Sequence, residues 1–130
     1  MIAQPISAST IELFSKNGGN PLGLYSQKDP LMIVGYILQW QRAEDDEIMQ
    51  RVGERILSRS VEKAKEMGLW HRFIYQNYAG MGQDVFEGYG RRNRERLEIV
   101  RRGVDPEGVF TRLQPGGFKV HDLERYPDVE

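Results

Sequence analysis

The chain has 130 residues, of which 39% are hydrophobic and 28% charged, a composition typical of an ordinary globular protein. Its net charge of −1 argues against nucleic acid and anionic membranes as partners, and no run of about 18 apolar residues predicts a membrane span. The lack of cysteine excludes disulfides, thiol nucleophiles and cysteine-based metal sites, and no secretory signal is recognisable, so we expect a cytoplasmic protein.

For residues 1–30 the sequence predicts little regular structure. Residues 1–20 are polar and end in a loop sequence, Asn-Gly-Gly-Asn-Pro at 17–21, so we expect a partly irregular segment with a short helix over 9–16. A short strand is predicted at 22–25. The continuous apolar, β-branched run at 31–38 predicts a strand that is covered on both faces.

A long helix is predicted after this strand. Acidic residues crowd its start at 44–47, Lys63 and Lys65 lie near its end, and apolar residues recur between them at helical spacing. Gly68 is expected to end it. A third strand, Phe-Ile-Tyr-Gln-Asn-Tyr, is predicted at 73–78.

The last predicted helical region begins at Asp84, where Asp84 and Glu87 form a capping pair, and it ends at Gly103. Its many arginines alternate with glutamates, which predicts a solvated, salt-bridged face and not a nucleic-acid surface.

The order strand, strand, helix, strand, helix predicts an α+β fold in one domain, residues 1–130, with 1–20 and 115–130 partly irregular. We expect a small antiparallel sheet backed by helices. Three strands leave exposed edges, so a homodimer is expected.

Three motifs in the second half of the chain resemble one known family. Residues 75–80, Tyr-Gln-Asn-Tyr-Ala-Gly, resemble the C-terminal Tyr-x-Asn-Tyr strand of berberine-bridge-enzyme-like FAD-linked oxidases. Residues 89–97 are similar to their Tyr-Gly-x-x-Asn-x-x-Arg-Leu helix, and residues 105–110 followed by Gln114 are similar to their closing motif. Upstream, residues 18–24 and 39–40 resemble the fungal members.

The resemblance implies a fold, a cofactor and site residues. The fold would be the ferredoxin-like half of the oxidase's substrate domain, whose sheet lies over the flavin. Asn77 and Asn93 would touch that cofactor, and Tyr75 or Tyr78 would lie beside the substrate, where related oxidases use a tyrosinate base. The family's FAD-binding domain has no counterpart here, so we expect no cofactor, and FAD only if a separate FAD-binding domain is supplied.

The candidate catalytic residues are Tyr75, Tyr78 and His71, because phenols and imidazoles can transfer protons. Strand alternation would place Tyr75 with Asn77 on one face and Tyr78 on the other. The alternative is that both tyrosines only pack, with their hydroxyls at the rim, and that His71 is a surface residue at a strand end. The candidate substrate-binding residues are Asn77, Tyr36, Trp40, Tyr89 and Asn93.

No metal site is expected, since His71 and His121 are far apart in the sequence and cysteine is absent.

Three functions remain open from the sequence. The favoured one is a stand-alone enzyme that acts without flavin on a small hydrophobic secondary metabolite, as a cyclase, isomerase or dehydratase, because such chemistry needs mainly a shaped cavity and a few polar groups. The others are a C-terminal fragment of an FAD-dependent oxidoreductase and a non-catalytic metabolite-binding or accessory protein.

Overall fold

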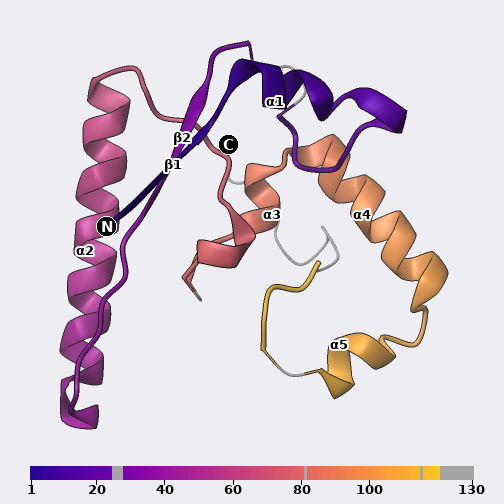
Figure 1. Ribbon diagram of the computed structural model, residues 1–130. Helices are drawn as coiled ribbons and strands as arrows, with labels where there is room; N and C mark the ends of the chain where they lie inside the picture. The colour runs from indigo at the N-terminus through magenta and orange to yellow at the C-terminus, as the bar shows by residue number, and fades with distance from the viewer. Residues whose placement is uncertain (25–27, 81, 115, 121–130) are drawn as a thin grey trace. The chain divides into compact units, whose positions relative to one another are not determined.

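The computed structural model describes residues 1–24, 28–80, 82–114 and 116–120, and the chain forms two compact units (Figure 1). The first unit comprises Met1–Ile6 and Leu31–His71, and the second comprises Ser7–Pro30 and Arg72–Glu130. A two-stranded antiparallel sheet together with helices confirms the predicted α+β class.

The sheet belongs to the first unit. Strand β1 (Ile2–Ile6) pairs antiparallel with β2 (Leu31–Gly35), so that Ile2 lies opposite Gly35 and Ile6 opposite Leu31. Residues 2–6 were predicted to be irregular, and this prediction was wrong. Strand β1 is stabilised by pairing with β2, which is distant in the sequence, so no local pattern indicates it.

The apolar run at 31–38 predicted a strand that is covered on both faces. Strand β2 is present, but only one of its faces is covered. Leu31 and Ile33 are half-buried, whereas Met32 and Val34, which alternate with them, are exposed. Successive side chains of a strand point to opposite faces, so one face of β2 is left uncovered in this structure.

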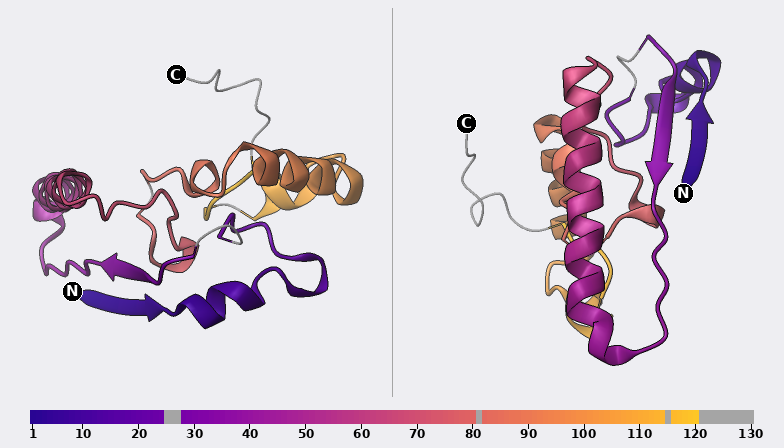
Figure 2. Two further views of the ribbon diagram at one scale, coloured as in Figure 1. Left: turned by 90° about the horizontal axis from the view of Figure 1, so that it is seen from above. Right: turned by 90° about the vertical axis from the view of Figure 1, so that its left-hand side faces the viewer.

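The long helix is α2 (Asp46–Glu66), which follows the short turn η2 (Ala43–Asp45). It begins with acidic and ends with basic residues, and Gly68 stands just beyond it with a positive φ of 68°, as predicted. Figure 2 shows α2 running back along the segment that leads into it. The hydroxyls of Tyr36 and Ser60, which share a hydrogen bond of 2.9 Å, tie the two together.

Short helices make up most of the second unit. They are α1 (Ala8–Leu13), α3 (Val85–Gly88), α4 (Arg91–Val104) and α5 (Val109–Leu113), with the turns η1 (Lys16–Gly18) and η3 (Gln76–Tyr78). The fully buried side chains Ile11, Leu24 and Val85 lie in this unit, and so does the nearly buried Tyr89. The predicted short helix near residue 9 and the final helical region are therefore confirmed.

Two predicted strands were wrong. Residues 73–75 are irregular and lead into the turn η3, since no described strand lies beside them to accept ladder hydrogen bonds. Residues 22–24 form no strand, and Tyr25 is outside the described residues. None of the described helices is long and apolar enough to cross a bilayer.

Candidate functional site

The turn η3 brings Tyr75 and Tyr78 together. The Tyr78 amide donates to the Tyr75 carbonyl at 3.0 Å, which closes a turn of the 3₁₀ type. In such a turn residues three apart lie on the same side, and the two rings meet edge to face with centroids 4.9 Å apart. The predicted placement on opposite faces was therefore wrong, and the two phenols form one pair.

Asn77 completes this pair. Its Nδ2 donates a hydrogen bond of 2.9 Å to the Tyr75 Oη, so the phenolic hydrogen of Tyr75 is free to point to another acceptor. Tyr78 is exposed and Tyr75 half-buried. The cluster Tyr75, Asn77 and Tyr78 thus offers aromatic surface for an apolar molecule, together with a phenol and an amide that can orient a carbonyl or hydroxyl group or exchange a proton with it.

Tyr89 belongs to the core of the second unit. Its ring stacks on Phe73 and meets Phe86 edge to face, with centroids 6.0 and 5.6 Å apart. Burial raises the pKa of Tyr89 above its ordinary value of 10.0, because the phenolate loses its hydration. Tyr89 is therefore a neutral phenol near pH 7, and in this structure it packs the interior.

Asn93 is also interior. It is 8% exposed, and its Nδ2 donates to the Tyr89 carbonyl at 2.8 Å. Gly23, with a φ of 75°, lies so close that a Cβ added to it would be 2.4 Å from the same carbonyl oxygen. Asn93 and Gly23 thus hold the loop after α1 against the start of α4, and of the two asparagines predicted to touch flavin only Asn77 is exposed.

Arg72, three residues before the first family-like motif, lies against the two glycines on either side of Tyr89. A Cβ at Gly88 would be 2.6 Å from the Arg72 carbonyl oxygen, and one at Gly90 would be 2.7 Å from the Arg72 Nη2. The glycines allow the chain before η3 to approach the junction of α3 and α4. Sequence reasoning missed Arg72, whose only signal was the pair of glycines that surrounds Tyr89.

The third family-like motif contains the residue that caps helix α5. The buried Asp105 accepts hydrogen bonds from the Val109 amide at 2.6 Å and from the Phe110 amide at 3.2 Å. These are amides of the first turn of α5, which have no partner inside the helix. The Asp105 side chain therefore has a structural role.

The remaining predicted site residues lie in the first unit. The Trp40 Nε1–H donates to the Asp46 Oδ1 at 2.6 Å at the start of α2, and Tyr36 is bonded to Ser60. His71 is half-buried and ends this unit. The predicted set is thus divided between the two units, and the structure brings two parts of it into direct contact: the exposed turn cluster Tyr75, Asn77 and Tyr78, and the interior pair Tyr89 and Asn93. His121 lies outside the described residues.

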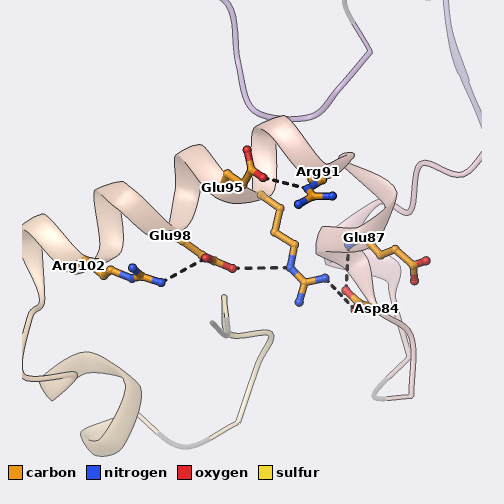
Figure 3. Close-up of polar contacts among 7 residues, drawn as sticks. Asp84, Glu87, Arg91, Glu95, Glu98 and Arg102 are labelled. Atoms are coloured by element: carbon orange, nitrogen blue, oxygen red, sulfur yellow. Dashed lines mark hydrogen bonds and ion pairs between the residues drawn. The ribbon is translucent and has the colours of Figure 1, made fainter. Parts of the chain in front are cut away.

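Charged side chains join α3 to α4 (Figure 3). Asp84 caps α3 by accepting from the Glu87 amide at 3.0 Å, and its carboxylate lies 3.7 Å from the Arg94 Nη1. Glu98, only 4% exposed, lies between Arg94 and Arg102, at 3.9 and 3.6 Å.

The predicted capping pair of Asp84 and Glu87 is confirmed, because the Asp84 side chain accepts from the Glu87 amide. The predicted solvated face fits Arg91 and Glu95, which form an exposed pair, but it was wrong for the buried Glu98. Within the described residues, no three histidine, aspartate or glutamate side chains gather as metal ligands.

Comparison with known proteins finds fungal enzymes that are similar to most of the chain. It is 41% identical over 118 residues to the FAD-dependent monooxygenase tpcD of Cochliobolus heterostrophus, and 39% over 117 residues to the FAD-dependent monooxygenase FUP4 of Fusarium proliferatum. It is 36% identical over 119 residues to the FAD-dependent monooxygenase sdcF of Emericella nidulans. The chain is homologous to a segment of fungal FAD-dependent monooxygenases.

These alignments cover nearly the whole chain but little of the relatives. They include 91%, 90% and 92% of this chain and 23%, 23% and 25% of tpcD, FUP4 and sdcF. The chain thus spans about a quarter of the length of the curated relatives it matches. No family model matches it, and no solved structure does.

Proposed function

We propose that this chain is the substrate-side part of a fungal FAD-dependent oxidoreductase of the berberine-bridge type. In this proposal the cluster Tyr75, Asn77 and Tyr78 contacts a small hydrophobic secondary metabolite. The observation that carries it is the hydrogen bond from Asn77 to Tyr75 beside an exposed Tyr78, within a chain that aligns over nearly its whole length with FAD-dependent monooxygenases.

The chain's own residues do not fit FAD as a cofactor held by this chain alone. Asn93, one of the two expected contacts, is buried and its amide nitrogen is engaged by the Tyr89 carbonyl. Of the two expected flavin contacts, only Asn77 is exposed. We therefore propose that the flavin is bound by the region of the relatives that this chain does not match.

The role proposed for each side chain follows from its geometry. The Asn77 amide fixes the orientation of the Tyr75 oxygen and leaves the phenolic hydrogen to a substrate oxygen. The Tyr78 ring, edge-on to Tyr75, supplies apolar contact for a hydrophobic ring system. Proton transfer at the Tyr75 Oη would then accompany reaction of the bound metabolite.

The proposal is tested by replacing the matched segment of tpcD with this chain. The chimera should retain flavin and turn over the substrate of tpcD, whereas the isolated chain should be colourless. Tyr75→Phe should lower turnover about a hundredfold or more with unchanged flavin content, because positioned proton transfer is worth that much. Ser58→Ala, which removes an exposed hydroxyl of α2 outside the candidate residues, serves as the control.

Stoichiometric flavin on the isolated chain would contradict this assignment. So would a chimera in which Tyr75→Phe and Tyr78→Phe both keep full turnover.

A second function, a flavin-independent cyclase, isomerase or dehydratase, is favoured by one observation: the Tyr75 and Asn77 pair is complete within this chain. Native mass spectrometry of the purified chain distinguishes the two, since a bound metabolite without flavin would support this second function. A bound metabolite without any turnover would instead support an accessory protein that only binds.

A further inference from the structure

The chain that leads into the turn η3 runs against the junction of helices α3 and α4. Residues 72–74 lie beside residues 88–90, and both segments belong to the second unit. Between them the Phe73 ring stacks on the Tyr89 ring, with centroids 6.0 Å apart. The backbone is therefore anchored directly before Tyr75, the first residue of the candidate site.

The closeness of this contact depends on Gly88, the buried last residue of α3. A Cβ added to Gly88 would lie 2.6 Å from the Arg72 carbonyl oxygen and 3.3 Å from the Ile74 amide nitrogen. Both are backbone atoms, so no rotation of a side chain could relieve the overlap. Because interiors are closely packed, a methyl group at this position would force one of the two segments to move.

The segment is also anchored beyond η3. The Gly80 amide donates to the Gln83 Oε1 at 2.9 Å, and the Gln83 amide donates to the Gly80 carbonyl at 3.0 Å. The Tyr78 amide, bonded to the Tyr75 carbonyl, closes the turn between these two anchors. A short segment that is held at both ends can absorb a displacement only through its own φ and ψ angles. Moving residues 72–74 should therefore change the geometry of the turn.

We infer that Gly88 and Tyr89 are positioning residues for the Tyr75 hydroxyl. This inference rests on the proposed function, in which that hydroxyl meets the substrate. Gly88 sets how closely residues 72–74 approach the junction of α3 and α4, and the Tyr89 ring holds Phe73 there. Neither residue needs to touch the substrate, since a misplacement of about 1 Å that starts far from the chemistry can lower a rate roughly a hundredfold.

Hydrogen exchange in the isolated chain tests the geometry without the proposed function. Gly88→Ala should make the Tyr78 amide exchange about tenfold faster, because the hydrogen bond that closes the turn is disturbed. Amides in the middle of α4 should keep their protection, which separates this effect from general unfolding. Gly103→Ala is the matched control, since an added Cβ at this position of α4 meets nothing within 4 Å.

The tpcD chimera tests whether the position matters for turnover. Gly88→Ala should lower turnover about a hundredfold with unchanged flavin content. Phe73→Leu, which removes the stack on Tyr89 and adds no bulk, should act in the same direction and serves if Gly88→Ala does not fold. Combined with Tyr75→Phe, neither change should lower turnover further, because the hydroxyl that they position is already absent. A purely structural role would instead add its own loss to that of Tyr75→Phe.

The outcomes separate this inference from the proposed function. Full turnover by both Tyr75→Phe and Tyr78→Phe overturns the proposed function and this inference with it. If Tyr75→Phe lowers turnover whereas Gly88→Ala and Phe73→Leu do not, or if their losses add to that of Tyr75→Phe, the positioning role alone is wrong. A Tyr78 amide that exchanges equally fast in Gly88→Ala and Gly103→Ala also overturns the positioning role, whatever the chimera does.

Discussion

At the scale of single residues, several positions that resemble a family motif have structural roles. Tyr89 packs between Phe73 and Phe86, Asn93 holds the Tyr89 carbonyl, and Asp105 caps α5. Tyr75, Asn77 and Tyr78 differ from them, since they meet on the turn η3, where Asn77 and Tyr78 are exposed. This difference is the reason to seek chemistry in the turn and stability elsewhere.

Gly23 should tolerate no side chain. Gly23→Ala would require a positive φ that costs a non-glycine residue roughly 1–2 kcal/mol, and its Cβ would also clash with the Tyr89 carbonyl at 2.4 Å. We expect a loss of unfolding free energy above about 2 kcal/mol in a denaturant titration.

Gly108→Ala is the matched control for Gly23, since it has a φ of 64° and nothing within 4 Å. Equal losses for the two variants would mean that the backbone angle alone matters and that the close approach does not.

Tyr89 should make the protein sensitive to alkaline pH. Its pKa is raised in the folded state by burial, so its contribution to stability is complete below pH 10 and is lost as the pH rises through the raised folded value. The melting temperature of the wild type should therefore fall more steeply above about pH 10 than that of Tyr89→Phe. Parallel curves from pH 8 to 11 would rule out this linkage.

At the scale of elements, the sequence signals located the helices, but of the three predicted strands only the one that begins at residue 31 is found among the described residues, as β2. Helix α2 begins with acids and ends before Gly68, and such signals act within a few residues. The segment 73–78 has strand-forming residues but no neighbouring strand, so it forms the turn η3 instead. Strand β1, by contrast, has a proline and a polar residue and still pairs with β2.

The buried charges of α4 should matter more than its exposed ones. Arg94→Met leaves the buried Glu98 with Arg102 and without its partner at 3.9 Å, which should lower the unfolding free energy by about 3 kcal/mol. Arg91→Met removes an exposed pair with Glu95, and an exposed pair of this spacing contributes less than about 0.5 kcal/mol. Urea titrations of both variants measure the difference, and equal midpoints would show that Glu98 does not depend on Arg94.

At the scale of the whole molecule, the first unit should associate with a second copy. Its sheet has two strands, Met32 and Val34 are exposed, and a two-stranded sheet with one open face is marginal in water. Light scattering should give about twice the chain mass of 15.0 kDa, and Met32→Lys with Val34→Lys should shift the protein toward the monomer. A monomeric wild type at working concentration would contradict the expected homodimer.

The sequence by itself determined the α+β class, the extent of α2, the cap at Asp84 and the resemblance of the three motifs. Each of these depends on residues close together in the chain, or on patterns shared with relatives. Helix signals and capping act between residues three or four apart, so no distant contact is needed to predict them.

Only the tertiary structure decided the pairing of β1 with β2, the turn at Tyr75 and Tyr78, and the burial of Asn93 and Glu98. Strand pairing and burial depend on what lies opposite a residue in space, and that partner can be anywhere in the sequence. The candidate site was therefore predicted in its residues but not in its geometry. A strand would have separated the two phenols, and the turn sets them edge to face with Asn77 bound to Tyr75.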